Sequence, residues 1–256
     1  MLDAKAEEIE FSIAGRDFTI RQSPGILQSD RTGGTTGAAV WRASVHFAEW
    51  LAAPGNVLLE QDILNQGSTV LELGSGISGH IAAVLGERVK NVIATDQQYV
   101  VKILGENIRA NSRAAEKKST SRTKGSSSRN NIDVLALDWE KDDIAGFLRT
   151  HSLRTGVDAV VICDCIFNYA LIEPLVQTCL DLSIPKSATD TESEPHSNPT
   201  VFIIAQQLRQ PDVFEQWIRA FIKEFRVWRL PVSGIDPTSD AAIVVHVGIR
   251  RSFYLG

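Results

Sequence analysis

Hydrophobic and polar residues follow two different periods along this chain, and the first change of period comes early. Residues 9–23 alternate between polar and apolar on both sides of Ala14-Gly15, which predicts a β-hairpin. After a loop rich in turn residues, residues 38–52 repeat their apolar positions at helical spacing. The sequence therefore predicts an N-terminal hairpin and loop over residues 1–37, followed by a helix that leads into the main fold.

From residue 69 onward, short apolar runs alternate with helical patterns. The apolar runs, each of strand length, cover residues 69–73, 91–96, 132–139, 157–164 and 200–208. Helical patterns between and after them cover residues 79–88, 98–111 and 211–225. Such alternation predicts a mostly parallel sheet with helices on both faces. Two final extended runs, 226–232 and 241–251, have no long helix between them, so we expect an antiparallel pair at one edge of a seven-stranded sheet.

Two polar segments interrupt this pattern. Residues 112–131 are basic and rich in serine, and residues 187–199 are acidic and contain proline. Neither has enough apolar area to order itself, so we interpret both as mobile loop insertions in one domain that spans residues 1–256. An alternative is that the basic segment binds the substrate.

Composition narrows the classes of protein that fit. The chain has 256 residues, 43% of them hydrophobic, and a formal net charge of -5. This charge does not favour nucleic-acid binding. Three cysteines without a C-x-x-C pair, and scattered histidines, predict neither disulfides nor a metal site. With no signal-peptide pattern and no apolar run of about 20 residues, we expect a cytoplasmic monomer, a nuclear location being the alternative.

The residues that follow the first apolar run suggest a cofactor. Gly74, Gly76 and Gly79 fit the spacing G-x-G-x-x-G, which often marks a pyrophosphate site. Glu72, two residues earlier, would repel a pyrophosphate but would attract a cation. S-adenosylmethionine carries an ammonium and a sulfonium and no phosphate. We therefore interpret Gly74 and Gly76 as cofactor contacts, and Gly79 as a packing residue that lets the next helix approach the strand.

Other strands also end in residues that suit this interpretation, since ligands of open parallel sheets lie at the carboxyl ends of the strands. Asp96 is placed to accept hydrogen bonds from ribose hydroxyls, which either type of cofactor would provide. Trp139 is placed to stack on an adenine, although it could equally cap the core. Asp164 follows the fourth strand, where a carboxylate either meets the substrate or caps the next helix.

The motifs VWRAS, VLELGSGISG, ATD, LDW and CDCIFN occur in this order. With them, the chain resembles the methyltransferase-16 family of seven-strand protein lysine methyltransferases, most closely the fungal ribosomal lysine N-methyltransferase 5 group, over roughly residues 38 to 182. The resemblance implies a Rossmann-like class I methyltransferase fold with S-adenosylmethionine as cofactor. Its most specific motif is Asp/Glu-x-x-Tyr/Phe, matched by residues 164–167. Phe167 replaces the tyrosine of many relatives, so a mechanism that needs a phenol hydrogen bond there is in doubt.

The resemblance also assigns residues to a site. Together with Glu72, the residues that would contact the cofactor are Trp41, Gly74, Ser75, Gly76, Asp96, Trp139 and, through its backbone, Cys163. Asp164 and Phe167 would guide the substrate lysine: the carboxylate would orient the amine, and the aromatic ring would accept its aliphatic stem. The neutral amine would then attack the sulfonium methyl in line. The implied partner is a protein that presents a lysine, a ribosomal or other translation-linked protein being suggested.

Two alternatives remain open from the sequence. One is a nicotinamide-dependent oxidoreductase, which Glu72 and the absence of a Tyr-x-x-x-Lys group near the fourth strand disfavour. The other is a binding module that has kept the methyltransferase fold and lost turnover.

Overall fold

A seven-stranded sheet forms the centre of the molecule in the computed structural model, which describes residues 1–27, 35–119, 131–183, 198–232 and 243–254. The order of its strands is β5-β4-β3-β6-β7-β9-β8. Their bounds are β3 Thr69–Leu73, β4 Asn91–Asp96, β5 Ile132–Ala136, β6 Ala159–Cys163, β7 Val201–Gln207, β8 Phe225–Leu230 and β9 Ile243–Arg250. Strands β3 to β7 pair in parallel with one another, whereas β9 runs antiparallel to both β7 and β8. The predicted mostly parallel sheet with an antiparallel pair at one edge is confirmed.

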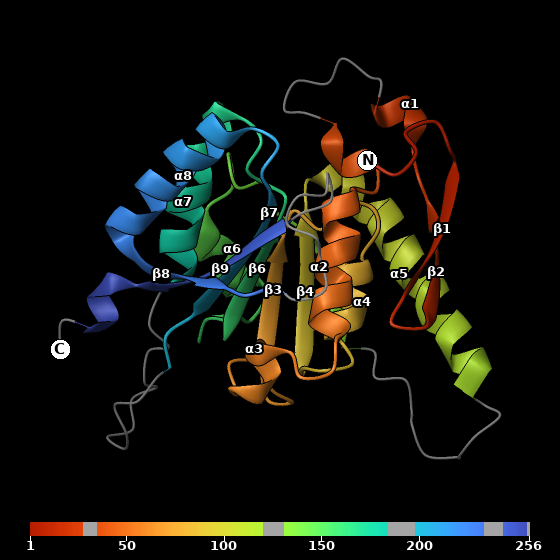
Figure 1. Ribbon diagram of the computed structural model, residues 1–256, viewed down its shortest axis with the longest axis horizontal. Coiled ribbons are helices and arrows are strands. Elements are labelled where there is room, and N and C mark those ends of the chain that lie inside the picture. Colours follow the sequence, from red (N-terminus) through yellow and green to blue (C-terminus); the bar gives the residue numbers. More distant parts are fainter. Residues whose placement is uncertain (28–34, 120–130, 184–197, 233–242, 255–256) are drawn as a thin grey trace.

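One face of the sheet is covered by α2 (Arg42–Ala52), α4 (His80–Leu85) and α5 (Gln98–Ser119), as Figure 1 shows. Both faces of the sheet are buried. Because successive side chains of a strand point to opposite faces, they pack in different halves of the core. In β3, Val70 packs with this first half, whereas Leu71 packs with the second. Glu72 follows Leu71 and therefore points to the same side as α2.

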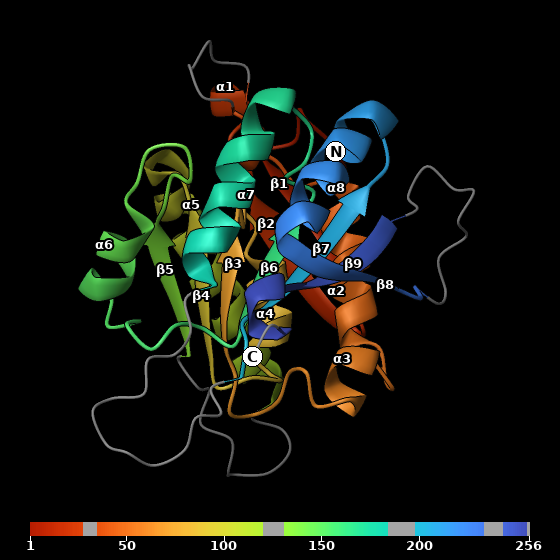
Figure 2. The same cartoon turned by 90° about the vertical axis from the view of Figure 1, so that its left-hand side faces the viewer.

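The opposite face is covered by α6 (Ile144–Thr150), α7 (Ile172–Leu182) and α8 (Pro211–Glu224), the layer turned toward the viewer in Figure 2. Trp217 and Phe221 of α8 are fully buried, and so is Phe225 at the start of β8. The rings of Phe221 and Phe225 stack with their centroids 4.1 Å apart. These aromatic side chains anchor α8 and the start of β8 in the second half of the core.

The N-terminal hairpin is confirmed as β1 (Glu8–Ile13) paired antiparallel with β2 (Arg16–Arg21). Two asparagines of α5 hold its free edge in place of a third strand. Asn107 accepts from the Arg21 N–H and donates to the Arg21 carbonyl, and Asn111 bonds Thr19 in the same way, at 2.9 to 3.0 Å. Asn107 also donates to the Ile77 carbonyl at 2.7 Å, which ties the hairpin to the glycine turn after β3.

The structure describes only part of each of the two predicted insertions. Helix α5 continues to Ser119, so the first part of the expected loop at 112–131 is helical, and that part of the prediction was wrong. Residues 120–130 and 184–197 lie outside the described residues. The short elements are α1 Pro24–Leu27, α3 Val57–Glu60, η1 Thr36–Ala38, η2 Tyr169–Leu171 and η3 Arg251–Tyr254. Among the helices described, none is both long and apolar enough to cross a membrane.

Candidate active site

A pocket opens where the carboxyl ends of β3, β4 and β6 meet, at the point where the order of the strands reverses. It encloses about 860 Å³ of empty space, a figure that includes the open solvent at its mouth. We call it the inner pocket. It is lined by all ten residues that the sequence predicted for the site: Trp41, Glu72, Gly74, Ser75, Gly76, Asp96, Trp139, Cys163, Asp164 and Phe167.

The glycine turn forms the floor of this pocket. Gly74 and Gly76 have φ angles of +68° and +62°, in the left-handed region that favours glycine. A Cβ at Gly74 would lie 2.7 Å from Cys165 Sγ and 3.1 Å from the Trp139 ring, so a side chain does not fit. The turn therefore presents bare backbone to the pocket.

The third glycine of the motif is outside the pocket, as predicted, but its packing partner differs from the one expected. A Cβ at Gly79 would lie 2.4 Å from Ile108 Cγ1 and 2.9 Å from Leu104 Cδ1. Both side chains belong to α5, so Gly79 allows the close approach of α5 rather than of α4, the helix that directly follows it.

Glu72 is a buried carboxyl directly beneath the turn. Burial raises its pKa to about 8, the negative charge of Asp96 adds to this rise, and the nearby Ser75 hydroxyl opposes it. Within the described residues, neither Oε2 of Glu72 nor the Ser75 hydroxyl makes a hydrogen bond of normal geometry. Ser75 is close enough to lower the pKa of Glu72, but Oε2 of Glu72 has no well-formed hydrogen bond among the described residues, and a buried carboxyl in this state favours a cationic ligand.

Asp96 ends β4 and faces the turn from the other side. One carboxylate oxygen accepts from the Gly76 N–H at 2.8 Å, and the other accepts from the Gln97 N–H at 2.7 Å. Burial raises the pKa of Asp96 to about 6, and these two backbone hydrogen bonds hold the rise back. Each oxygen retains a lone pair, so the carboxylate is fixed in place and still able to accept hydrogen bonds from a ligand.

Two tryptophans form walls of the inner pocket. Trp41 is the N-cap of α2 and its indole N–H donates to the Thr36 carbonyl at 2.9 Å. Trp139 follows β5, and its ring lies over the place where Gly74 lacks a Cβ. It also packs against the core under α6 and α7, so it serves both the core and the pocket.

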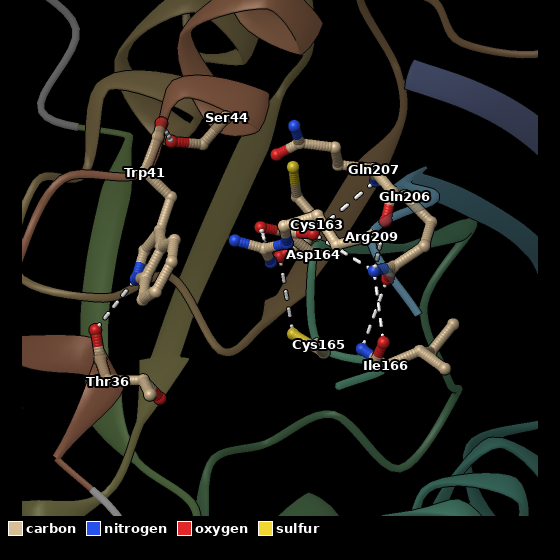
Figure 3. A network of polar contacts seen from close by, with 10 residues as sticks. All are labelled: Thr36, Trp41, Ser44, Cys163, Asp164, Cys165, Ile166, Gln206, Gln207 and Arg209. Carbon is tan, nitrogen blue, oxygen red and sulfur yellow. Dashed lines mark hydrogen bonds and ion pairs between the residues drawn. The ribbon is translucent and has the colours of Figure 1, made fainter. Parts of the chain in front are cut away.

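Asp164 occupies the turn after β6 in a left-handed conformation, with φ at +57°. It does not cap the next helical segment, because Asn168 caps η2 instead. Its Oδ1 accepts from Gln206 Nε2 at 3.0 Å and more weakly from the Gln207 N–H at 3.4 Å, and its Oδ2 pairs with the Arg209 guanidinium at 2.5 Å (Figure 3). Burial raises the pKa of Asp164, and the positive charge of Arg209 opposes the rise.

Gln206 fixes the segment from Asp164 to Ile166. Its side chain donates to Asp164 and to the Ile166 carbonyl, and it accepts from the Ile166 N–H at 3.1 Å (Figure 3). The sequence prediction missed both Gln206 and Arg209, because it considered the ends of the first four strands only. A glutamine in the apolar run VFIIAQQ at the end of the fifth strand was the available signal.

A second cavity adjoins the first and contains about 710 Å³ of empty space. We call it the outer pocket. Residues that line both pockets are Thr36, Trp41, Asp164 and Phe167, and residues that line only the outer one are Ile166, Gln206, Gln207, Arg209 and Gln210. The acidic motif thus stands on the partition between two cavities, with room for a ligand on either side.

Comparison with known proteins agrees with this geometry. A family model described as "Lysine methyltransferase" matches residues 21–192. A protein of Zygosaccharomyces rouxii named ribosomal lysine N-methyltransferase 5 is 29% identical, over 86% of this chain and 74% of its own length. A Schizosaccharomyces pombe protein named diaminohydroxyphosphoribosylamino-pyrimidine deaminase is also 29% identical, over 94% of this chain but only 51% of its own length. A solved bacterial methyltransferase domain, CtHen1-CN, has the same fold at 12% identity with a TM-score of 0.50, covering 81% of this chain and 99% of that domain.

Proposed function

We propose, from the premise that this chain belongs to the lysine methyltransferase family, that it transfers a methyl group from S-adenosylmethionine to the side-chain amine of a lysine in a protein. The observation that carries the proposal is the buried Glu72 carboxyl beside a bare glycine turn, with one oxygen that makes no well-formed hydrogen bond to any part of the chain that the structure describes. It stands in a pocket that also contains Asp96, Trp139 and Asp164.

The inner pocket suits S-adenosylmethionine residue by residue. Glu72 takes the ammonium of its methionine part, and Gly74, Ser75 and Gly76 support that part with backbone and a free hydroxyl. Asp96 accepts hydrogen bonds from the ribose, and Trp139 lies along the adenine. A pyrophosphate in this place would add negative charge beside a buried carboxyl whose own ionisation is already disfavoured, which argues against a nicotinamide cofactor.

When bound, S-adenosylmethionine supplies a methyl group on a sulfonium, which a neutral amine takes by in-line displacement to leave a neutral thioether. No acid is needed for the leaving group, so the contribution of this chain is position and desolvation. A lysine has an ordinary pKa near 10.4 and must first pass its proton to water. Removal from water in the partition between the two pockets favours its neutral form.

The lysine enters on the side of Asp164 and Phe167. The carboxylate orients the amine, and Gln206 keeps that carboxylate at a fixed height above the pocket. Phe167 offers an aromatic face to the lysine stem and to the cation that forms on nitrogen. Because Phe167 has no hydroxyl, the amine receives no phenol hydrogen bond at this position.

The names of relatives suggest a substrate. The relative from Z. rouxii and those from Saccharomyces cerevisiae are named for ribosomal lysine methylation, and we propose a ribosomal protein as the target. The deaminase name of the S. pombe relative belongs to a protein twice as long as its matching part. Zinc deaminases use H-x-E and P-C-x-x-C motifs, and neither is present in this sequence.

Two measurements test the proposal. Calorimetry with S-adenosylhomocysteine and, separately, with NADH asks which cofactor binds; we expect binding of the first alone. This protein is then incubated with tritiated S-adenosylmethionine and with ribosomal proteins from an S. cerevisiae strain that lacks its own ribosomal lysine N-methyltransferase 5. We expect label on lysine. Both measurements are repeated with Glu72→Gln, which removes the charge proposed to hold the ammonium. Glu10→Gln, the same change on an exposed residue of β1, is the control. Absence of S-adenosylhomocysteine binding would overturn the proposal, and binding without transfer would favour a module that has lost turnover.

A further inference from the structure

Arg209 lies across the partition between the two pockets. Its guanidinium pairs with Asp164 Oδ2, and its Cζ lies 4.7 Å from the centroid of the Trp41 ring. Trp41 and Asp164 line both pockets, whereas Arg209 lines only the outer one. Figure 3 shows the guanidinium between the indole of Trp41 and the carboxylate of Asp164. The side chain therefore bridges the two walls between which a ligand must pass to go from the outer to the inner pocket.

Both contacts of Arg209 are those that a substrate lysine would need. A lysine that reaches the inner pocket needs a carboxylate for its cationic head and an aromatic face for its stem. Oδ1 of Asp164 is already bonded to Gln206 and to the Gln207 backbone, so Oδ2 is the oxygen that faces a cation. In the structure, Arg209 takes both this oxygen and the indole face.

Exchange of one cation for another is feasible at this position. The side chain of Asp164 is 4% exposed, so leaving it without a partner would be costly, but the side chain of Arg209 is 32% exposed and borders solvent. An arriving lysine that is still protonated replaces the arginine, so the buried carboxylate keeps a cationic partner during the exchange. The released guanidinium returns to water, where its hydration replaces the lost ion pair.

We propose that Arg209 is a gate residue, which holds the lysine's place on Asp164 and Trp41 and is displaced when a protein lysine enters from the outer pocket. This inference rests on the proposed methyl transfer to lysine. Arg209 acts through the two residues that it covers and is not itself a catalytic residue. It makes entry of the substrate a competition between two cations, which selects for a ligand that offers both a cation and a slender apolar stem.

Steady-state kinetics of methyl transfer to the ribosomal proteins distinguish a gate from a fixed wall. Arg209→Gln removes the competing cation, so we expect the KM for the protein substrate to fall roughly fivefold, as for loss of a partly exposed ion pair, with S-adenosylhomocysteine affinity unchanged. Arg209→Lys keeps a cation but loses planar stacking, and its KM should lie between the two. Arg219→Gln, which removes an exposed arginine paired with Glu215 on α8, should leave KM as it is. An unchanged or higher KM for Arg209→Gln would overturn the gate.

A second measurement uses the wild-type protein, in case Arg209→Gln does not fold. The nitrogen-15 resonance of Arg209 Nε is followed in the complex with S-adenosylhomocysteine while Nα-acetyl-lysine methylamide is added. We expect it to shift as the lysine saturates, and to stay in place with the norleucine analogue, which has no amine. A resonance that does not move at saturating lysine compound would overturn the proposal. If the wild type neither binds S-adenosylhomocysteine nor transfers methyl groups, the proposed function fails; if it does both and Arg209 passes neither test, only the gate fails.

Discussion

Replacing Glu72 with glutamine should make the cofactor-free protein more stable and the cofactor weaker, and these opposite effects have one cause. Burial raises the pKa of Glu72 from an ordinary value of 4.5 to about 8, so the folded protein keeps this proton while the unfolded chain loses it. The contribution of Glu72 to stability is therefore fully present below pH 4.5 and is lost as the pH rises toward 8. Glutamine has nearly the same shape and does not titrate.

The size of the effect follows from the same pKa values. Each pH unit in which only the unfolded chain is ionised lowers the free energy of unfolding by about 1.4 kcal/mol. At pH 7 the accumulated loss is about 3 kcal/mol, and Glu72→Gln recovers this amount minus the cost of burying an amide without partners. That cost does not depend on pH, so the slope is the cleaner observable: between pH 6.5 and 7.5, stability should fall by about 1.2 kcal/mol more in the wild type than in the variant.

Urea unfolding of the cofactor-free protein at pH 6.5, 7.0 and 7.5 measures this slope, with Glu10→Gln as control. The window lies above the pKa of Asp96, which is about 6, and contributions from other groups cancel in the difference between the two proteins. Calorimetry at pH 7 should show S-adenosylhomocysteine bound roughly 10- to 100-fold more weakly by Glu72→Gln, the value of a hydrogen bond to a charged group. Parallel slopes, or equal affinities, would refute the role of Glu72 as the partner of an ammonium.

Three further substitutions, with one control, separate effects on the fold from effects on the site. Gly74→Ala places a Cβ 2.7 Å from a buried cysteine sulfur at a φ of +68°, so thermal unfolding should show a loss of roughly 2 kcal/mol or more and no stabilisation by S-adenosylhomocysteine. Gly25→Ala, with open space around it, should change neither. In Gly79→Ala the new Cβ would lie 2.4 Å from Ile108 Cγ1, so the melting temperature should fall. Affinity for S-adenosylhomocysteine should stay within about twofold. A lost affinity would contradict the assignment of Gly79 to packing. Gln206→Met removes the support of the acidic motif, so kcat/KM should fall by roughly tenfold or more at unchanged S-adenosylhomocysteine affinity, and an unchanged kcat/KM would argue against it.

The sheet and most of the inner pocket could be predicted because their signals are local. A short apolar run followed by a polar residue marks the carboxyl end of a buried strand, and the carboxyl ends of parallel strands meet at one edge. The sequence therefore predicts that Glu72, Asp96 and Asp164 lie at the same edge of the sheet. The structure places all three in one pocket.

Gln206 and Arg209 could not be assigned in this way, because their roles depend on pairing between strands. Asp164 meets them only because β6 and β7 are neighbours in a register that sets Cys163 opposite Ala205. A pattern along the chain does not contain that register. The extension of α5 to Ser119 was missed for a different reason: residues 112–119 are low in hydrophobicity, yet their alanine, glutamate and lysine residues favour helix. Low hydrophobicity therefore did not distinguish a loop from the last turns of α5.

The three carboxyl groups share one physical condition, which relates stability to binding in this protein. Burial raises the pKa of Glu72, of Asp96 and of Asp164, so each one costs stability when it is ionised in the absence of a ligand. Two backbone N–H groups reduce this cost at Asp96, and Arg209 reduces it at Asp164. Among the described residues, Oε2 of Glu72 has no partner of normal geometry that would do the same. Of the three, Asp164 already has a cation in Arg209, whereas Glu72 has none among the described residues. It follows that an ammonium-bearing cofactor should stabilise the protein more strongly at pH 8 than at pH 6, whereas a substrate lysine, which exchanges with Arg209, should add little stability at either pH.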